Sequence, residues 1–416
     1  MAKSVALQEI VALIEPGMRV LLHGGPVECA PFRDALRADP ERARHVTFTG
    51  LFLPGVNLFD YAGLTPSTRV EAPFLPPSSH GSFMDGRLEF LPFHYSDFIT
   101  HLSRQPADLA ILHLPPAERG SFSCGLGADV ADGVLRFARR VAVVANPAIP
   151  FTGGASALKV DEADWVCEQD TPLAAPAEPA QDPALSEAAQ RVADLIEDGD
   201  TLQIGIGRLP SAVLAGLTDR RRLRFHTGMI IDEVRQLLDA GACAPACAED
   251  PPVLTGIGLG GADMRAAAAR PEVAFHGIGV THDVCRIARI TRFTSINSAI
   301  EVDLLGNINC EHVRGRQVSG IGGASDFTRA ARLAPNGRAI VALPAQAHGK
   351  SRIVPRLEAG TTSITRNDTD ILVTEHGSAR VRGLGLDARA EAIMALAAPH
   401  HRPALADAWR ALRSTL

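Results

Sequence analysis

The sequence has 416 residues, 46% of them hydrophobic, and a formal net charge of -6 at pH 7. A chain of this length exceeds what one hydrophobic core usually organises, so we expect two domains of about 200 residues each. Lysine and arginine are scattered rather than clustered, which argues against nucleic acid or an anionic membrane as a partner and favours a small molecule.

The sequence predicts no targeting segment, membrane span or metal site. The N-terminal stretch MAKSVALQEIVALIEPGMRV alternates apolar and charged residues like a surface helix and lacks the apolar core of a signal peptide. No apolar run approaches the roughly 20 residues that a spanning helix needs. Seven cysteines, an odd number spread along the chain, suit free thiols in a reducing cytoplasm. Cys243 and Cys247 have no second cysteine pair or histidine pair beside them, so we expect a loop there rather than a zinc site.

Two stretches of the chain share one pattern. LIEPGMRVLLHGGP at 13–26 and LIEDGDTLQIGIGRLP at 195–210 both read Leu-Ile-Glu-x-Gly, then a short strand and a glycine-rich turn. This pattern indicates a helix that leads into the first strand of an open sheet. We interpret it as an internal duplication, with a recurring helix-turn-strand element as the alternative. The stretch EQDTPLAAPAEPAQDPALSEAAQ between them has linker composition, so we predict domains at 1–180 and 181–416.

Further short runs predict the fold class. DLAILHLPP, VAVVAN, AIVALP and ILVTEHG are Val/Ile/Leu runs that end in polar or turn residues, as buried parallel strands do. Helical stretches such as AEAIMALAAPHHRPALADAWRALRSTL alternate with them. We therefore predict an α/β protein made of two open, doubly wound α/β domains.

The first candidate ligand loop is the glycine turn in LQIGIGRLPSAVLAGL. We expect a strand to end at Ile204, the chain to turn through Gly205 and Gly207, and a helix to begin near Pro210. Glycines let backbone N–H groups approach a ligand, and a helix N-terminus adds partial positive charge. A turn made only for tight packing is the alternative, because the third glycine of the dinucleotide fingerprint is missing.

The second candidate is SINSAIEVDLLGNINCEHVRGRQVSGIGGASDFTRAA at 295–331. It carries Asn297 in a strand-like run and then SGIGG directly before a helix that we expect to begin around Asp326. Backbone N–H groups of Gly322 and Gly323 can hold a carbonyl oxygen on which negative charge develops. The alternative is a loop that needs glycine only for close passage from strand to helix.

The third candidate is Glu375, which follows a predicted buried strand and stands beside His376 and Gly377. A carboxylate at the end of a strand is a candidate functional group. A helix-capping or ion-paired role is equally open.

The order of these motifs resembles that of a known family. GIG..P.AV, HT.M..D, INSAIEVDL.G, SGIGG..DF.R.A, SRIVP.L and VTE.G.A..RG are similar to motifs of the acetyl-CoA hydrolase/transferase family, which includes 4-hydroxybutyrate, butyrate and succinate CoA-transferases. The similarity spans nearly the whole chain and includes LHLPPAERGSFSCGLGADV and ANPAIPFTGG in the first half. The resemblance implies two open α/β domains of the CoA-transferase type with the active site between them.

The resemblance also implies a mechanism that one residue contradicts. Members of the family usually work through a glutamate that attacks an acyl-CoA, becomes a glutamyl-CoA thioester and passes CoA to an acceptor acid. That glutamate stands in a His-Ser/Thr-Glu-Met stretch, at the position that is Gly228 here. Glycine cannot form the thioester. Glu233 would begin about 7 Å away, which disfavours it as a replacement, and Ala324 stands where relatives often carry glutamine.

The resemblance implies which residues contact the ligand. The positions that match CoA contacts of the family are Gly205, Ile206, Gly207, Arg208, Leu209, Ile300, Gly320, Gly322 and Gly323. The catalytic candidates are Glu375, Asn297 and Glu233. Coenzyme A or an acyl-CoA is expected as substrate or ligand, with a small carboxylic acid as acceptor, as in acetate metabolism, and with no covalently bound cofactor. We expect a dimer or other homo-oligomer, or a hetero-oligomer with a paralogue.

Three functional hypotheses follow. The chain hydrolyses an acyl-CoA, with Glu375 or Glu233 orienting water; or it is a catalytically silent subunit that binds CoA; or it remains a transferase through Glu233. The identity of the acyl group depends on the shape of the pocket and on no motif.

The conformation of Gly228 bears on these hypotheses. If Gly228 marks only a lost nucleophile, its φ should be ordinary for any residue, and the fold should accept Gly228→Glu at little cost in stability. A positive φ would strain the glutamate by roughly 1 to 2 kcal/mol and would indicate a rebuilt turn.

Overall fold

The computed structural model describes residues 2–173, 183–247, 250–358 and 360–415. The chain folds as two compact units, which are described separately. Unit 1 comprises Met1–Pro176, Ala246–Thr281 and Val318–Gly322, and unit 2 comprises Ala177–Pro245, His282–Gln317 and Gly323–Leu416. The boundary expected at residue 180 lies outside the described residues, and nothing in the sequence indicated that segments 246–281 and 318–322 join unit 1.

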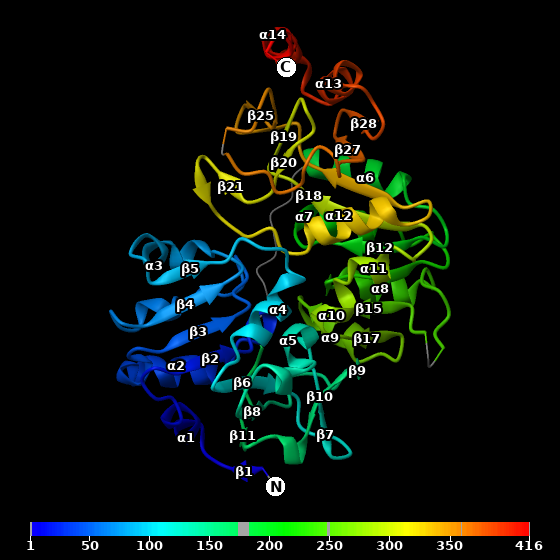
Figure 1. Cartoon of the computed structure of the whole chain (residues 1–416). Helices are drawn as coiled ribbons and strands as arrows, with labels where there is room; N and C mark the ends of the chain where they lie inside the picture. Colours follow the sequence, from blue (N-terminus) through cyan, green and yellow to red (C-terminus); the bar gives the residue numbers. More distant parts are fainter. Residues whose placement is uncertain (1, 174–182, 248–249, 359, 416) are drawn as a thin grey trace. The chain divides into compact units, whose positions relative to one another are not determined.

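Unit 1 is built on an eight-stranded sheet in the order β1-β11-β8-β6-β2-β3-β4-β5 (Figure 1). Each neighbouring pair in it is parallel. The strands are β1 (Lys3–Ser4), β2 (Arg19–Leu22), β3 (Thr47–Gly50), β4 (Arg69–Ala72), β5 (Leu88–Phe90), β6 (Leu109–Leu114), β8 (Val141–Ala145) and β11 (Trp165–Glu168). The helices among them are α1 (Leu7–Ala12), α2 (Ala30–Ala38), α3 (His80–Met84), α4 (Asp97–Arg104) and α5 (Ala128–Ala131).

Smaller elements complete unit 1. The strands β7 (Ser121–Ser123) and β10 (Ser156–Lys159) pair antiparallel, and β15 (Val253–Thr255), β17 (Val273–Phe275) and β9 (Gly153–Gly154) form a parallel run. The other elements are β16 (Ile257–Gly258), α9 (Ala262–Ala268), α10 (Ile278–Thr281), and the 3-10 helices η1 (Gly25–Val27), η2 (Pro40–Ala43), η3 (Tyr61–Gly63), η4 (Pro77–Ser79), η5 (Val134–Arg136) and η6 (Val160–Glu162).

The spacing of apolar residues explains how unit 1 packs. In α1, Leu7, Ile10 and Val11 are buried, and their spacing places them on one face of the helix. Every residue of β6, LAILHL, is buried, as expected for a parallel strand covered on both faces. The predicted strand DLAILHLPP therefore lies in the interior.

Unit 2 contains six strands in the order β28-β27-β23-β18-β12-β13. All neighbouring pairs with a known register are parallel except the antiparallel pair of β27 and β28. These strands are β12 (Thr201–Ile204), β13 (Arg224–His226), β18 (Phe293–Ser298), β23 (Arg338–Ala342), β27 (Ile371–Thr374) and β28 (Gly377–Arg380). The helices are α6 (Pro183–Asp194), α7 (Arg208–Ala215), α8 (Glu233–Asp239), α11 (Val284–Ile287), α12 (Ala324–Leu333), α13 (Leu386–Ala395) and α14 (Arg402–Arg413), with the 3-10 helix η7 (Pro399–His401).

Short strands form the rest of unit 2. They are β14 (Met229–Ile230), β19 (Glu301–Asp303), β20 (Ile308–Asn309), β21 (His312–Val313), β22 (Arg316–Gln317), β24 (Gln346–Ala347), β25 (Lys350–Ser351) and β26 (Ile353–Val354). Of these, β20, β19 and β26 form a three-stranded sheet, and β24 and β25 pair as a hairpin. The helix α6 packs against β27, and α12 packs against β18 and β23 (Figure 1).

The order of strands confirms the α/β class and supports an internal duplication. Unit 1 contains the run β11-β8-β6-β2-β3, and unit 2 contains the run β27-β23-β18-β12-β13. If the five strands of each run are numbered by their order along the chain, both runs have the spatial order 5-4-3-1-2. The two Leu-Ile-Glu-x-Gly stretches lead into the matching strands β2 and β12.

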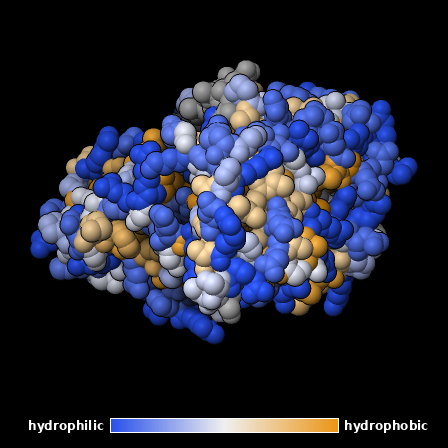
Figure 2. Space-filling view, turned by 90° about the horizontal axis from the view of Figure 1, so that it is seen from above, coloured by the Kyte–Doolittle hydropathy of each residue, from blue (hydrophilic) through white to orange (hydrophobic). Residues whose placement is uncertain are grey.

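Polar side chains cover much of one face of the molecule. Figure 2 shows hydrophilic side chains over much of the face in view, with hydrophobic ones in groups between them. Across the described ranges, no helix combines the length and the apolar composition that crossing a bilayer requires.

A buried carboxylate ties three strands of unit 2 together. Asp200, directly before β12, is 0% exposed and accepts hydrogen bonds from Arg338 at the start of β23 and from Arg292 before β18, the latter at 3.1 Å. Its backbone oxygen also accepts the N–H of Arg224, which begins β13, at 3.0 Å. The ion pairs therefore fix the amino ends of neighbouring strands.

Replacing Asp200 by alanine should lower the free energy of unfolding by about 3 kcal/mol, because it leaves two arginines without their buried carboxylate. Urea denaturation measures the change. The matched control is Asp219→Ala, which removes an exposed carboxylate paired with Arg220 and should change stability by less than about 1 kcal/mol. Equal, small effects of both substitutions would contradict the role given to Asp200.

Candidate functional site

A pocket of about 760 Å³ lies in unit 2 where neighbouring parallel strands end. Its lining includes Ile206 beyond β12, Ser298 at the end of β18, Ala342 at the end of β23 and Glu375 beyond β27. Open α/β proteins bind ligands at the carboxyl ends of their strands, and the volume is in the range of small-molecule sites. The lining residues are Ala184, Leu185, Ile206, Gly207, Arg208, Leu209, Ser298, Ala299, Ile300, Val313, Ala342, Pro344, Gln346, Ala347, His348, Gly349, Arg352 and Glu375.

The predicted glycine turn forms one wall of this pocket. The strand β12 ends at Ile204 as expected, and Gly207 caps α7 with φ 106° and ψ -175°. Only glycine adopts that conformation readily. A Cβ at Gly207 would meet nothing within 4 Å, so the turn needs glycine for its backbone and not for packing. The first residues of α7, Arg208 and Leu209, line the pocket beside this turn.

The charged groups of the pocket favour an anionic ligand. Arg208 and Arg352 line it together with His348, against the single carboxylate of Glu375. The guanidinium of Arg352 donates a hydrogen bond to the carbonyl oxygen of Ile300 at 3.2 Å. Guanidinium groups and a helix N-terminus are the donors that phosphate and carboxylate groups prefer.

Glu375 is held in a defined position at the pocket wall. Its Oε2 accepts the backbone N–H of Ala345 at 2.8 Å, and its Oε1 lies 3.8 Å from Nε2 of His376. The side chain is 11% exposed. A carboxylate that is oriented but still reaches solvent can accept a proton from a bound water molecule.

Asn297 has a different environment. Its side-chain amide exchanges two hydrogen bonds with the amide of Gln203, at 3.1 and 3.3 Å, and the residue is 6% exposed. This pair joins β18 to β12 just before both strands end. Asn297 does not line the pocket, so we propose that it positions the strand ends rather than touching a ligand.

The pocket includes some of the residues expected from the sequence and leaves out others. It includes Ile206, Gly207, Arg208, Leu209, Ile300 and Glu375, but not Gly205, Glu233, Asn297, Gly320, Gly322 or Gly323. Glu233 is half-buried at the start of α8. In unit 1, a Cβ at Gly320 would lie 2.0 Å from the oxygen of Pro73, so close packing accounts for this glycine, whereas Gly322 has φ 57°, a backbone conformation that favours glycine.

Sequence reasoning missed Arg352 and His348 as pocket residues. Arg352 is part of the SRIVP motif, so a signal for it was present. His348 lies in the turn between β24 and β25 with φ 50°, and only the folded hairpin brings it to the pocket.

Gly228 has no positive φ, but its surroundings are crowded. It follows β13, and its φ lies outside the positive range, as the lost-nucleophile hypothesis requires. However, a Cβ at this position would lie 2.9 Å from Cε1 and 3.0 Å from Nε2 of His282. A side chain at 228 therefore requires the His282 ring to shift, and the expectation that the fold accepts Gly228→Glu at little cost stays a prediction that depends on whether this ring can move.

His282 is buried and uncharged. It is 4% exposed, and burial together with the nearby His226 lowers its pKa to about 3. Its ring lies 4.6 Å from that of Phe327, centre to centre. The imidazole is therefore a neutral, packed group at neutral pH.

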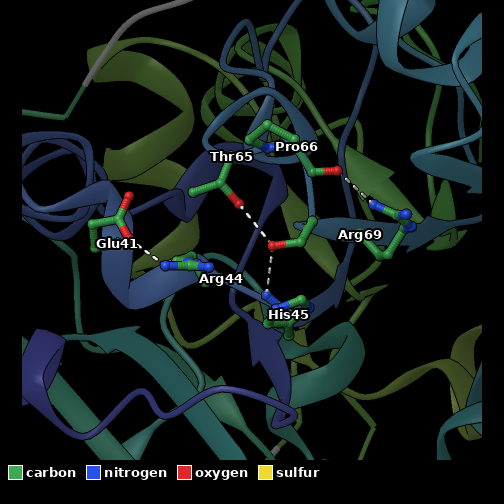
Figure 3. A pocket seen from close by; sticks show the side chains of 7 residues that line it. Glu41, Arg44, His45, Thr65, Pro66 and Arg69 are labelled. Carbon is green, nitrogen blue, oxygen red and sulfur yellow. Dashed lines mark hydrogen bonds and ion pairs between the residues drawn. The ribbon is translucent and has the colours of Figure 1, made fainter.

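A second pocket, of about 650 Å³, lies in unit 1 (Figure 3). Its lining residues precede β3 and β4, except Arg69, which begins β4. The pocket therefore lies at the amino ends of these strands and not at their carboxyl ends. Figure 3 shows Arg44 directed toward Glu41, at 3.2 Å, and Arg69 directed toward the oxygen of Pro66, at 3.1 Å. Its arginines already have partners, and we do not take it as the functional site.

The φ of Gly207 leads to a test of the turn. Gly207→Ala should lower the free energy of unfolding by about 1 to 3 kcal/mol, because alanine is strained in this conformation. Gly205→Ala is the control, since Gly205 has no positive φ and its Cβ would meet nothing closer than 3.6 Å. Urea denaturation compares the two. If both variants are as stable as the wild type, the turn does not depend on glycine at 207.

Comparison with known proteins agrees with the motifs. Residues 263–409 match the family model of the acetyl-CoA hydrolase/transferase C-terminal domain. The chain is 30% identical to a 4-hydroxybutyrate coenzyme A transferase of Clostridium kluyveri, over 98% of this chain and 97% of that protein. It is 31% identical to a butyryl-CoA:acetate CoA-transferase of Anaerostipes caccae, over 78% of this chain and 76% of that protein.

Solved structures give the same result. RipA from Yersinia pestis superposes with a TM-score of 0.89 at 25% identity, covering 99% of this chain and 97% of that one. A 4-hydroxybutyrate CoA-transferase from Porphyromonas gingivalis superposes with a TM-score of 0.79 at 27% identity, covering 100% of this chain and 98% of that one. The chain belongs to the acetyl-CoA hydrolase/transferase family of CoA-transferases.

Proposed function

We propose that this chain binds coenzyme A and small acyl-CoA thioesters in the pocket of unit 2 and does not form a glutamyl-CoA thioester at position 228. The observation that supports the proposal is that Gly228 has no carboxylate and that Cε1 of His282 stands 2.9 Å from the place where a Cβ at 228 would lie.

The pocket suits coenzyme A in charge and in shape. Coenzyme A has phosphate groups at one end and a thiol at the end of a long, partly apolar arm. Arg208, Arg352 and the N-terminus of α7 supply donors for phosphate. Leu185, Leu209 and other apolar side chains supply a surface for the arm.

The transferase hypothesis that relies on Glu233 receives no support from the site. Glu233 begins α8 and does not line the pocket, whereas Glu375 does. Covalent catalysis needs the reacting atoms within about 3.5 Å of one another. Of the carboxylates considered, Glu375 is therefore the one we assign to the ligand.

Hydrolysis of the bound thioester is the second candidate function, and the position of Glu375 favours it. A water molecule attacks the thioester carbonyl carbon, and Glu375 accepts a proton from that water. The carbon–sulfur bond then breaks, and the departing thiolate takes up the proton. The products are free coenzyme A and a small carboxylic acid.

We also propose a setting for this function. The partners are an acyl-CoA and a small carboxylic acid, and no covalently bound cofactor is needed. The chain acts as a homo-oligomer, or with a paralogue that carries the glutamate, in the cytoplasm. All seven cysteines are free thiols, which supports a reducing compartment.

Isothermal titration calorimetry tests the binding site. The wild type should bind coenzyme A and acetyl-CoA, and Arg208→Ala should weaken binding about 10-fold or more, because a charge-assisted contact to phosphate is lost. Arg235→Ala is the control, since Arg235 pairs with Asp239 on α8 away from the pocket. Absence of binding by the wild type at millimolar ligand would contradict the proposal.

Release of free thiol from acetyl-CoA tests the hydrolytic candidate. Any turnover by the wild type should fall by about 10²-fold or more in Glu375→Gln, because the amide cannot accept the proton. Binding of coenzyme A by the variant, measured by calorimetry, should remain. Unchanged turnover in Glu375→Gln would exclude Glu375 as the base.

A further inference from the structure

Two glycines of unit 2 contact the same imidazole. A Cβ at Gly228 would lie 2.9 Å from Cε1 of His282, and a Cβ at Gly323 would lie 2.5 Å from both Cδ2 and Nε2 of the same ring. Real Cβ atoms do not come within 3.0 Å of such neighbours. The two glycines are far apart in the sequence, and the ring of His282 is a neighbour that they share.

A positive φ does not explain either glycine. The φ of Gly228 lies outside the positive range, and Gly323 has φ -88° and ψ 2°, which other residues adopt readily. At both positions the ring of His282 occupies the place that a Cβ would take.

The ring cannot move aside without cost. It packs on Phe327, with 4.6 Å between ring centres, and a Cβ at Gly323 would also lie 2.8 Å from Cε2 of that ring. Phe327 belongs in turn to a buried cluster with Phe293, Ala330 and Ala331. A close-packed interior resists such displacement.

We propose that His282 fills the space in which the nucleophilic side chain of residue 228 would stand, so that residues 228 and 282 together determine whether glutamyl-CoA chemistry is possible. A carboxylate at 228 requires a residue smaller than histidine at 282. This inference rests on the proposed function and adds a second residue to it: the absence of transfer depends on the histidine at 282 as well as on the glycine at 228. His282 acts here as a positioning residue.

A double-mutant cycle measures the pair directly. Gly228→Ala adds only a Cβ, which is the atom that would overlap His282, and should lower the midpoint of thermal unfolding by about 3 to 8 °C. In the His282→Ala background the same substitution should cost little, because the ring is gone, so the two effects should be strongly non-additive. Gly385→Ala is the control, since Gly385 has φ -66° and its Cβ would meet nothing within 4 Å.

The cycle has clear opposing outcomes. If Gly228→Ala leaves the midpoint unchanged, or lowers it equally with His282 present and absent, the proposal is overturned. His282→Asn, which keeps a shorter polar side chain, replaces His282→Ala in the cycle if the alanine variant does not fold. These unfolding measurements use no ligand, so their result does not depend on whether the protein binds coenzyme A. Calorimetry on the wild type tests that binding separately.

A chemical readout tests the consequence for the reaction. A carboxylate at 228 would attack the carbonyl of acetyl-CoA and break its carbon–sulfur bond, giving an acetyl-glutamyl anhydride and the thiolate of CoA. The thiolate would then attack the glutamyl carbonyl and release acetate, leaving glutamyl-CoA. Intact-protein mass spectrometry after incubation with acetyl-CoA should detect this adduct in Gly228→Glu/His282→Ala and not in Gly228→Glu. Equal formation of the adduct in both variants would overturn the proposal.

Discussion

The parallel pairing of β27, β23, β18 and β12 is the constraint on which the account of the site depends. Because these strands are parallel neighbours, their carboxyl ends meet at one edge of the sheet. Asp200 fixes the opposite end through Arg338 and Arg292, and the amides of Asn297 and Gln203 join two strands where they end. The glycine turn and Glu375 thereby reach one pocket although they are far apart in the sequence.

The same arrangement separates binding from covalent chemistry. The pocket, with Arg208, Arg352 and Glu375, has the charges and the volume that an acyl-CoA site needs. Position 228 has no carboxylate, and a neutral, buried histidine stands beside it. We therefore propose that this family member keeps the ligand site of a CoA-transferase while the route through a glutamyl thioester is closed.

The fold class and the glycine turn could be predicted from the sequence, because both depend on local patterns. The runs DLAILHLPP, VAVVAN, AIVALP and ILVTEHG correspond to β6, β8, β23 and β27, and β12 ends at Ile204 as expected. The packing of His282 against Gly228 and Gly323 could not be predicted, since it joins three distant segments and no pattern in any of them indicates it. The pairing of Asn297 with Gln203 was missed for the same reason.

We propose that the pocket of unit 2 holds coenzyme A without a covalent link to the protein. A crystal structure of the wild-type protein grown with acetyl-CoA is the decisive experiment. We expect a noncovalent ligand with phosphate groups beside Arg208 and Arg352, its thioester end near Glu375, and the His282 ring still beside Gly228. Ligand density elsewhere in the molecule, or a thioester bond to Glu233 or another carboxylate, would contradict it.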